Sequence, residues 1–414
     1  MIRRNPERRP VGKPLPAADR GRNVTFRTNP RVDAVKSPPI PEAWRWVEGL
    51  QFPADRPLLD VCQAVPSSPP PQALRDHVAR RAEDPATAKY TEIFGLPALR
   101  EKLAADIVGI YGGDVAAGDA MIMAGCNQAF FNTMVALAGD GDHILLPAPW
   151  YFNHEMTADM LGVGAVALPF QADRNGVPNP EDARRLVNDK TRAIVLVTPN
   201  NPTGAVYPPD VLDAFFEVAR DAGCALVIDE TYRDFLPSGY QPHDLFARKD
   251  WRDTLVHLYS FSKVYCLTGY RVGAAVAGGR FAQALEKVTD CVQICAPHLG
   301  QEAAIFGLDN LKDWREQNSA VMAGRAEALR RAFARNDLTY DLVSAGAYFA
   351  YIRHPFEDRS DVEVAKMLAR EHGLLSLPGS WFGPGQERYL RFAFANLDES
   401  VMPAIVERLV ESQG

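Results

Sequence analysis

The sequence has little of what marks several common protein classes. Its six cysteines are scattered over 414 residues without a CxxC pair, so a disulfide framework is not expected. The eight histidines show no HxxxH or HExxH spacing, so a metal site has no sequence support. No apolar run is long enough to span a bilayer. The cysteine usage fits a reducing, cytoplasmic location best.

Clustered positive charge is also scarce, since the net charge is -7. Binding to nucleic acid or to a membrane surface needs a concentrated positive field, so we expect neither. The one basic stretch is the N-terminal arm, residues 1–30, which is rich in arginine and proline. It lacks the apolar core of a secretory signal, and Glu7 and Asp19 interrupt its charge, so a transit peptide is not expected either. We expect this arm to be disordered or to contact a partner subunit.

What the sequence does contain is an alternation of short apolar runs with helical stretches, typical of parallel βαβ units. The runs are apolar on both faces, as expected for strands covered by helices on each side. One helix, predicted over residues 211–222, is expected to end at Gly223. Seven strands are predicted, over residues 120–125, 143–149, 165–170, 192–199, 224–230, 255–260 and 271–278.

The C-terminal part has a different pattern, which predicts an antiparallel α+β module with helices near 361–372 and 398–411. The N-terminal residues are too few for a domain of their own, so we assign them to this module. The predicted fold class is therefore α/β: a large domain with a mostly parallel mixed sheet between helices, and a smaller α+β domain built from the N- and C-terminal segments. The predicted boundaries are 67–308 for the large domain, and 31–66 with 309–414 for the small one.

Four features lie at or just after the carboxyl ends of predicted strands, where ligands bind in open α/β sheets: Asn201, Asp229, Lys263 and the Gly125 turn. A lysine in a desolvated site can form a Schiff base with an aldehyde. A carboxylate can keep a pyridine nitrogen protonated. An arginine, serine hydroxyls and helix N-terminal amides can bind a phosphate dianion. Together these groups describe a site for pyridoxal phosphate.

Four motifs then carry a family resemblance: "SFSKVYCLTGYRVG" (260–273), "TPNNPTG" (198–204), "IDETY" (228–232) and "YLRFAFA" (389–395). From about Pro39 to the C-terminus, the chain resembles the class I/II aminotransferases of the aspartate aminotransferase superfamily, which are fold type I pyridoxal-phosphate enzymes. The resemblance implies that pyridoxal 5'-phosphate is the cofactor. It also implies transfer of the amino group of an L-amino acid, aspartate, aromatic or related, to a 2-oxo acid.

The resemblance also implies a role for each matching residue. Lys263 would bond to the cofactor and move the proton, and Asp229 would pair with the pyridine nitrogen. Tyr232 would act with these two in catalysis and would share the ring oxygen with Asn201. The other cofactor contacts implied are Ser260, Ser262, Arg271, Tyr151, Tyr90 and the backbone of Gly125, Cys126 and Asn127. The substrate contacts implied are those of Asn201, Ala64 and Arg391, which would clamp the α-carboxylate.

Some positions carry further expectations. Tyr90 matches a tyrosine that reaches the phosphate of the other subunit, which implies a homodimer with shared active sites. Ala64 stands where glycine is usual, so its φ angle is constrained. Trp150 is an alternative to Tyr151 as the stacking ring. The resemblance also implies cis peptide bonds before Pro149 and before Pro202.

The sequence gives Glu230 no role in the site, and it shows no clear second substrate-binding arginine. Glu230 points to the opposite face of its strand from Asp229, so we expect it to be an ordinary solvated carboxylate. No arginine clearly matches one that would read a dicarboxylic side chain, although Arg31 and Arg280 stay open.

Two other functions remain as alternatives. A β-eliminating lyase or a decarboxylase would use nearly the same residues, because the reaction depends on which bond stands perpendicular to the cofactor ring. A cofactor-binding transcriptional regulator is disfavoured, because the N-terminal arm is short and has no helix-turn-helix pattern.

Overall fold

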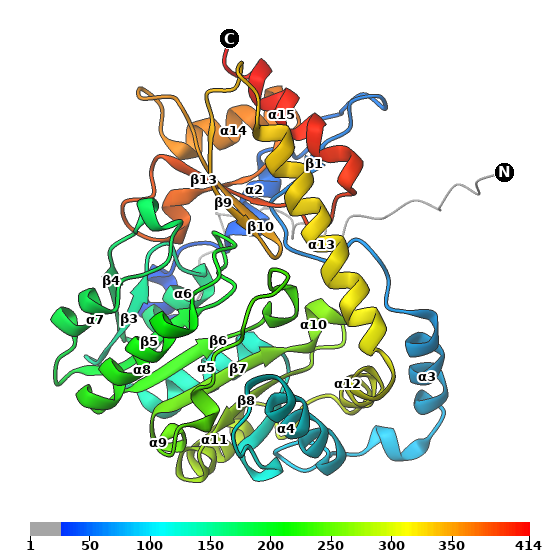
Figure 1. Ribbon diagram of the computed structural model, residues 1–414, viewed down its shortest axis with the longest axis vertical. Helices are drawn as coiled ribbons and strands as arrows, with labels where there is room; N and C mark the ends of the chain where they lie inside the picture. Colours follow the sequence, from blue (N-terminus) through cyan, green and yellow to red (C-terminus); the bar gives the residue numbers. More distant parts are fainter. Residues whose placement is uncertain (1–25) are drawn as a thin grey trace.

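A seven-stranded sheet forms the centre of the computed structural model, which describes residues 26–414 (Figure 1). The strand order is β2-β8-β7-β6-β5-β3-β4. β8 runs antiparallel to both of its neighbours, and all the other pairs are parallel. The predicted strands and the mixed, mostly parallel sheet are therefore confirmed. In chain order the strands are β2 (Ala120–Met123), β3 (His143–Pro147), β4 (Gly164–Leu168), β5 (Thr191–Val197), β6 (Ala225–Asp229), β7 (Leu255–Ser260) and β8 (Gly273–Ala277).

Helices cover both faces of this sheet, and the alternation of β5 shows why both faces are apolar (Figure 1). Ile194 and Leu196 belong to the core under one face, whereas Ala193 and Val195 belong to the core under the other. The helices of this region are α3 (Gln72–Ala82), α4 (Pro97–Tyr111), α5 (Cys126–Leu137), α6 (Phe152–Leu161), α7 (Pro180–Leu186), α8 (Pro209–Ala222), α9 (Trp251–Thr254), α10 (Phe261–Val264), α11 (Gly279–Val292) and α12 (His298–Asn310).

Helix α8 illustrates how the local sequence sets these boundaries. Pro209 occupies its first turn, where the missing N–H has no intrahelical partner to lose. Its buried residues Leu212, Phe215 and Phe216 recur at helical spacing and face the core. The helix ends at Gly223, which has a left-handed φ of 65°, as predicted.

A smaller antiparallel sheet, ordered β12-β13-β10-β9, lies beside the large one (Figure 1). Strand β1 (Leu59–Asp60) pairs with β11 (Leu374–Leu375), so a segment from the first part of the chain and one from the last part meet in this region. This arrangement confirms the predicted fold class. The remaining strands are β9 (Asp341–Gly346), β10 (Phe349–Arg353), β12 (Leu377–Pro378) and β13 (Tyr389–Ala393). The remaining helices are α1 (Pro30–Ala34), α2 (Pro39–Arg45), α13 (Lys312–Phe333), α14 (Asp361–Glu371) and α15 (Met402–Glu411).

The last helix is shorter than predicted. The sequence pattern started it at residue 398, but residues Glu399–Val401 form a 3-10 turn and α15 begins at Met402. Pro403 lies in the first turn of α15, a position that suits proline and fixes the start of the helix.

The predicted domain boundaries stay a prediction. α13 contacts α10 and α12 near one end, and β9 and α15 near the other, so this one helix runs beside both sheets. Residues 1–25 of the predicted arm lie outside the described residues. Within residues 26–414, no helix combines the length and apolar character needed to cross a membrane.

Two glycines lie at the contact between the loop after β5, residues 198–204, and the small sheet. A side chain on Gly204, which has a φ of 73°, would meet the Gly346 carbonyl oxygen at 2.5 Å. The neighbouring Ser344 Oγ donates a hydrogen bond of 2.8 Å to the Thr203 carbonyl. The backbones can approach this closely only because neither glycine has a side chain.

We expect Gly346→Ala to destabilise the protein by about 1–3 kcal/mol, because the new Cβ collides with the Gly204 carbonyl and the backbones must separate. Urea unfolding measures the change. Gly109→Ala is the control: Gly109 lies inside α4 with open space around it, so alanine should be neutral or stabilise by up to ~1 kcal/mol. Equal stabilities for the two variants would contradict the close contact.

Candidate active site

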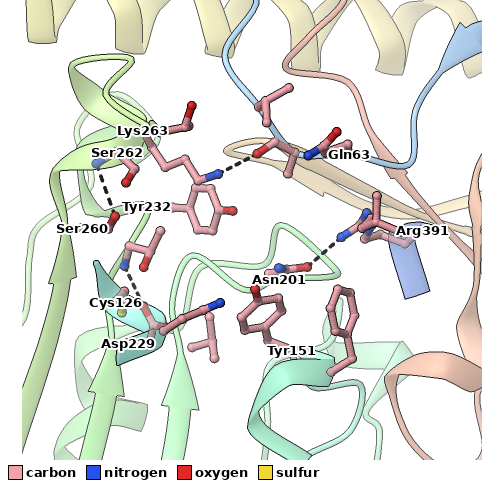
Figure 2. Close-up of a pocket in the computed structure, with 18 of the residues that line it drawn as sticks. Gln63, Cys126, Tyr151, Asn201, Asp229, Tyr232, Ser260, Ser262, Lys263 and Arg391 are labelled. Atoms are coloured by element: carbon pink, nitrogen blue, oxygen red, sulfur yellow. Dashed lines mark hydrogen bonds between the residues drawn. The ribbon is translucent and has the colours of Figure 1, made fainter. Parts of the chain in front are cut away.

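A cavity of about 260 Å³ opens beyond the carboxyl ends of β5, β6 and β7 (Figure 2). Strand ends of the large sheet form one side, and Arg391 of β13 and the segment after β1 form the other. The structure brings together most of the predicted residues: Ala64, Cys126, Asn127, Tyr151, Asn201, Asp229, Tyr232, Ser260, Ser262, Lys263, Arg271 and Arg391. The cavity is also lined by residues that the sequence did not indicate, among them Gln63, Thr231 and Thr268.

Lys263 follows β7 on the short helix α10. The residue that caps the N-terminus of that helix is Ser260, whose Oγ accepts a hydrogen bond of 3.3 Å from the Ser262 N–H. The Lys263 Nζ donates a hydrogen bond of 2.6 Å to the Ala64 carbonyl oxygen (Figure 2). Burial, with the positive charges of Arg271 and Arg391, lowers the pKa of Lys263 to about 8. A useful fraction of this amine is therefore neutral, and so nucleophilic, near neutral pH.

Asp229 is the last residue of β6 and is buried. Its Oδ1 accepts a hydrogen bond of 2.9 Å from the Thr231 N–H, and its Oδ2 lies 3.6 Å from His154 Nε2. Burial opposes the charge on Asp229, but His154 and Thr231 outweigh it and hold the pKa of the carboxyl below its usual value. Asp229 therefore presents a fixed negative charge to the cavity.

No sequence pattern pointed to His154 as a partner of Asp229. The signal that could have found it is its place on α6, one turn after Tyr151, which puts both side chains near the same face. Its ring stacks on Phe130 at 3.9 Å between centroids, and it is 2% exposed. These contacts fix the imidazole behind the carboxylate.

One end of the cavity is built to receive an anion. Helix α5 begins at Cys126 after Gly125, as predicted, so its first backbone N–H groups have no carbonyl of a preceding turn to bind. Arg271 reaches this end and donates hydrogen bonds of 3.1 Å to the carbonyls of Thr268 and Ala124. Ser262 Oγ is buried and has no partner among the described residues. These donors surround one space.

Glycines make that arrangement possible. Gly125 itself does not line the cavity, but a side chain on it would collide with the Arg271 guanidinium. Gly125 also has a φ of 90°, which favours glycine. A side chain on Gly273 would lie 2.9 Å from the Cys126 N atom. Glycine at both positions lets the arginine and the start of α5 approach each other.

Arg391 occupies the far end of the cavity and is 2% exposed. Its Nη1 donates a hydrogen bond of 3.3 Å to Asn201 Oδ1, and its Nη2 donates to the Cys62 carbonyl. Its Nε has no partner within residues 26–414. Burial lowers the pKa of Arg391 to about 10, so the group stays cationic at neutral pH. This is a buried cation with an unused donor.

Of the aromatic residues considered for the cofactor, two line the cavity, Tyr151 and Tyr232, and two do not, Trp150 and Tyr90. Tyr151 lines the cavity, and its hydroxyl accepts a hydrogen bond of 2.8 Å from Asn153. Trp150 is buried elsewhere, with its Nε1 3.4 Å from Glu155. Burial raises the pKa of Tyr232 well above its usual value, so its hydroxyl stays protonated and can donate. Tyr90 lies outside the cavity of its own chain and is 76% exposed.

The expectation that Glu230 is an ordinary solvated carboxylate is wrong. It is 4% exposed, and its Oε2 lies 2.9 Å from His257 Nε2 and accepts a hydrogen bond from the Tyr111 hydroxyl. Burial opposes its charge, but His243 and His257 hold the pKa of Glu230 below its usual value. Its side chain does point away from the cavity, but helices cover that face of the sheet too.

The backbone around the cavity includes three cis peptide bonds: Ala148–Pro149, Thr198–Pro199 and Asn201–Pro202. The first and last are those that the resemblance implied, whereas the bond before Pro199 was not predicted. Ala64 is not among the positive-φ residues of the described chain, so alanine fits where the family has glycine.

Comparison with known families decides what this arrangement is. The model of the family "Aminotransferase class I and II" matches residues 56–409. The chain belongs to the class I and II aminotransferases. This aminotransferase is similar to an aromatic aminotransferase of Arabidopsis thaliana, with 29% identity over 358 residues, 85% of this chain and 88% of that protein. It is also similar to an aspartate aminotransferase of Sulfolobus acidocaldarius, with 26% identity over 84% of this chain and 87% of that protein.

Solved structures share the fold of this aminotransferase. The aspartate aminotransferase of Thermus thermophilus with maleate superimposes with a TM-score of 0.85, over 93% of this chain and 99% of that one, at 24% identity. An aminotransferase from Staphylococcus aureus gives a TM-score of 0.79 at 26% identity, over 86% of this chain and 93% of that one. The predicted family and the predicted enzyme class, a transferase of amino groups, are confirmed.

Proposed function

We propose that this aminotransferase binds pyridoxal 5'-phosphate in the cavity and transfers the amino group of an L-amino acid to a 2-oxo acid. The observation that carries the proposal is that Lys263, Asp229 and Arg271 line one cavity, so an amine of lowered pKa, a carboxylate and a phosphate-binding cation serve one ligand. The family match and the names of the relatives support the same reaction.

The donor set of the cavity fits this cofactor. The unpartnered Ser262 Oγ, Arg271 and the first N–H groups of α5 supply the donors that a phosphate dianion needs. Asp229 supplies the negative charge for a protonated ring nitrogen. Asn201 and Tyr232 supply hydrogen-bond donors for the ring oxygen. Tyr151 supplies a flat surface for stacking.

When bound, pyridoxal phosphate supplies a conjugated ring that takes up the electron pair left when the α-proton of the amino acid is removed. Lys263 would form the covalent link and then, released as a free amine, carry the proton from the α-carbon to the cofactor. Its lowered pKa suits both tasks, because a base works best when its pKa is near the working pH. Asp229 and Arg391 would hold the two ends of the assembly in place during the transfer.

The experiment that tests the proposal is incubation of the loaded enzyme with each common amino acid while the absorbance of the cofactor is recorded. Conversion to the amino form, and its reversal by a 2-oxo acid, are expected. Release of ammonia or carbon dioxide without that conversion would contradict transamination and would instead support the lyase or decarboxylase alternative.

We expect Arg391→Lys to raise KM for the amino acid by about 10- to 100-fold, because an ammonium cannot form the bidentate pair that a guanidinium forms with a carboxylate. Steady-state kinetics measure the effect. Arg353→Lys is the matched control, since Arg353 lies on the neighbouring strand β10 but is exposed and paired with Asp341. An equal KM for both variants would contradict the clamp.

We also infer a homodimer with shared sites that works in the cytoplasm. Tyr90 is exposed and lies outside the cavity of its own chain, as a residue that serves a partner's site would. All six cysteines are free, which suits a reducing compartment. Light scattering of the purified protein should give twice the chain mass, and a monomer would contradict the dimer.

A further inference from the structure

We propose that Tyr348, supported by Asn318, positions Lys263: it binds the backbone of the helix that carries the lysine and ties that helix to the strand that carries Arg391. The inference rests on the proposed function, in which Lys263 moves the proton and Arg391 holds the α-carboxylate. Tyr348 itself does not line the cavity. It is a positioning residue, because it acts through two residues that do.

Tyr348 contacts Lys263 at the C-terminal end of α10. This helix has only four residues, so the carbonyl groups at its end need partners from outside the helix. The Tyr348 hydroxyl donates a hydrogen bond of 3.3 Å to one of them, the Lys263 carbonyl. Burial raises the pKa of Tyr348 well above its usual value, so this hydroxyl stays protonated and remains a donor.

The ring of Tyr348 also lies close to the amine of Lys263. The Lys263 Nζ is 5.7 Å from the centroid of the Tyr348 ring and 5.8 Å from that of the Tyr232 ring. An ammonium at this distance is attracted to an aromatic ring. Tyr348 is 0% exposed, and its ring packs against those of Tyr232 at 5.2 Å and Phe235 at 4.9 Å. The amine therefore lies beside two rings that are fixed by packing.

The backbone of Tyr348 joins it to the strand of Arg391. The Tyr348 carbonyl accepts a hydrogen bond of 3.0 Å from the N–H of Phe394, which follows β13. The next residue, Phe349, begins β10, and β10 pairs with β13 along its length. Tyr348 is thus bound through its backbone to the strand that carries Arg391, and through its hydroxyl to the helix that carries Lys263.

Helix α13 holds the next carbonyl of α10 in a similar way. Trp314 Nε1 and Asn318 Nδ2 donate hydrogen bonds of 3.1 and 2.9 Å to the Val264 carbonyl. Arg315, the residue after Trp314, is anchored in turn by Asp234 at 2.7 Å. Because α13 runs beside both sheets, it gives α10 a second connection to the small sheet (Figure 1). The last two carbonyls of α10 are therefore both held by side chains from outside that helix.

The proposed reaction makes this arrangement important. The α-proton lies on the carbon next to the carboxylate that Arg391 would bind, and Lys263 has to reach it. Because Lys263 is bonded to the cofactor at one stage and free at another, its own backbone has to bring the amine back to the same place. A displacement of roughly 1 Å can lower a rate about 100-fold. Tyr348 keeps the base and the carboxylate-binding arginine at a fixed separation.

The first test is Tyr348→Phe, which removes the hydroxyl and keeps the ring. With any amino acid that the wild type converts, we expect kcat to fall about tenfold and KM to change less than about twofold, because proton transfer is more sensitive to geometry than binding is. Since proton transfer would then limit the rate more strongly, a substrate deuterated at the α-carbon should show a larger isotope effect on kcat than it does with the wild type.

Tyr340→Phe is the matched control for this variant. Tyr340 is 3% exposed, and its hydroxyl shares a hydrogen bond of 2.8 Å with Ser412, away from the cavity. Loss of this hydroxyl removes one buried hydrogen bond from the same part of the protein without touching α10. Its kcat and isotope effect should equal those of the wild type.

The second test needs no turnover and uses hydrogen exchange of the purified protein, read by mass spectrometry. The N–H groups of Cys266 and Leu267 bond back to the carbonyls of Lys263 and Ser262, so their exchange reports how firmly α10 is held. In Tyr348→Phe we expect these amides to exchange about fivefold faster than in the wild type, as the loss of one hydrogen bond allows. Tyr340→Phe should leave their exchange unchanged.

Asn318→Ala examines the support from α13 by the same two measurements. It removes a donor to the Val264 carbonyl, so it should speed exchange at the end of α10 and lower kcat, with KM nearly unchanged. Asn310→Ala is its control, because Asn310 donates to the Phe306 carbonyl within α12 and does not contact α10. This control should behave as the wild type does.

Faster exchange together with a lowered kcat in Tyr348→Phe would support the proposal. Unchanged exchange, or faster exchange with an unchanged kcat and isotope effect, would overturn it. If the wild type converts no amino acid, the proposed function itself fails, and the exchange measurement alone decides whether Tyr348 holds α10. Should Tyr348→Phe not fold, Asn318→Ala decides by the same readings whether Lys263 is positioned through the end of α10.

Discussion

Lys263→Ala is expected to lower kcat by roughly 10⁵-fold or more, the scale seen when a nucleophile that also serves as a base is removed. Lys263 is the one lysine among the described residues that line the cavity, so no neighbour can take over its proton transfer. The variant should also lose the absorbance of the lysine-linked cofactor while it keeps the phosphate-binding groups. Stopped-flow absorbance and steady-state rates measure both effects.

The control for this variant is Lys102→Ala. Lys102 lies on α4 and pairs with Asp309 on the surface, so its loss should leave kcat unchanged. If Lys263→Ala retained both turnover and the lysine-linked absorbance, the assignment of Lys263 would be wrong.

The pH dependence of cofactor capture gives a second measure of Lys263. Only the neutral amine attacks an aldehyde, and the pKa of Lys263 is lowered to about 8. The rate at which apoprotein captures pyridoxal phosphate should therefore rise almost tenfold per pH unit up to about pH 8 and then level off. A rate that keeps rising to pH 10 would show an amine with an ordinary pKa.

Asp229→Asn is expected to lower kcat by roughly 10³-fold, as when a preorganised charge at a reacting centre is removed. The substitution keeps the size of the side chain and the Thr231 contact, but it removes the negative charge that stabilises a protonated ring nitrogen. Because the effect acts on the electronics of the reaction, kcat should fall much more than KM rises. Pre-steady-state rates of cofactor conversion measure the step directly.

The contrasting variant is Glu230→Gln, one residue along. Glu230 is equally buried but faces His257 and Tyr111 behind the sheet. We expect it to lose about 1–3 kcal/mol of stability by disturbing buried hydrogen bonds, with little change in kcat. If Glu230→Gln lowered kcat as much as Asp229→Asn, charge at the cavity would not explain the effect.

Most of the fold could be predicted because it depends on local patterns. The strands of the large sheet are apolar runs followed by turns, and Gly223 marks a helix end by its backbone freedom. Pro403 in the first turn of α15 sets where this helix begins. The sequence pattern alone predicted a start at residue 398, which is too early. Strand and helix boundaries were thus least certain where a cap or a proline sets them.

The site was predictable where residues lie at strand ends, because parallel strands bring those ends to one edge. Lys263, Asp229 and Asn201 are of this kind. Lys263 donates a hydrogen bond to the Ala64 carbonyl, and Arg391 donates one to the Cys62 carbonyl. Both carbonyls are far from their donors in the sequence, so no local pattern predicts these contacts. Glu230 was misjudged because strand alternation gives the direction of a side chain but not what covers that face.

The pairing of β1 with β11 has a consequence for synthesis. Leu59 and its partner Leu374 are separated by 315 residues (374 minus 59), whereas the whole large sheet lies between them in the sequence. At about 5–20 residues per second, translation of that interval lasts roughly 15–60 s. During this time the large sheet can form on the ribosome, while the apolar segment around Val61 still lacks the strand with which its neighbour Leu59 pairs.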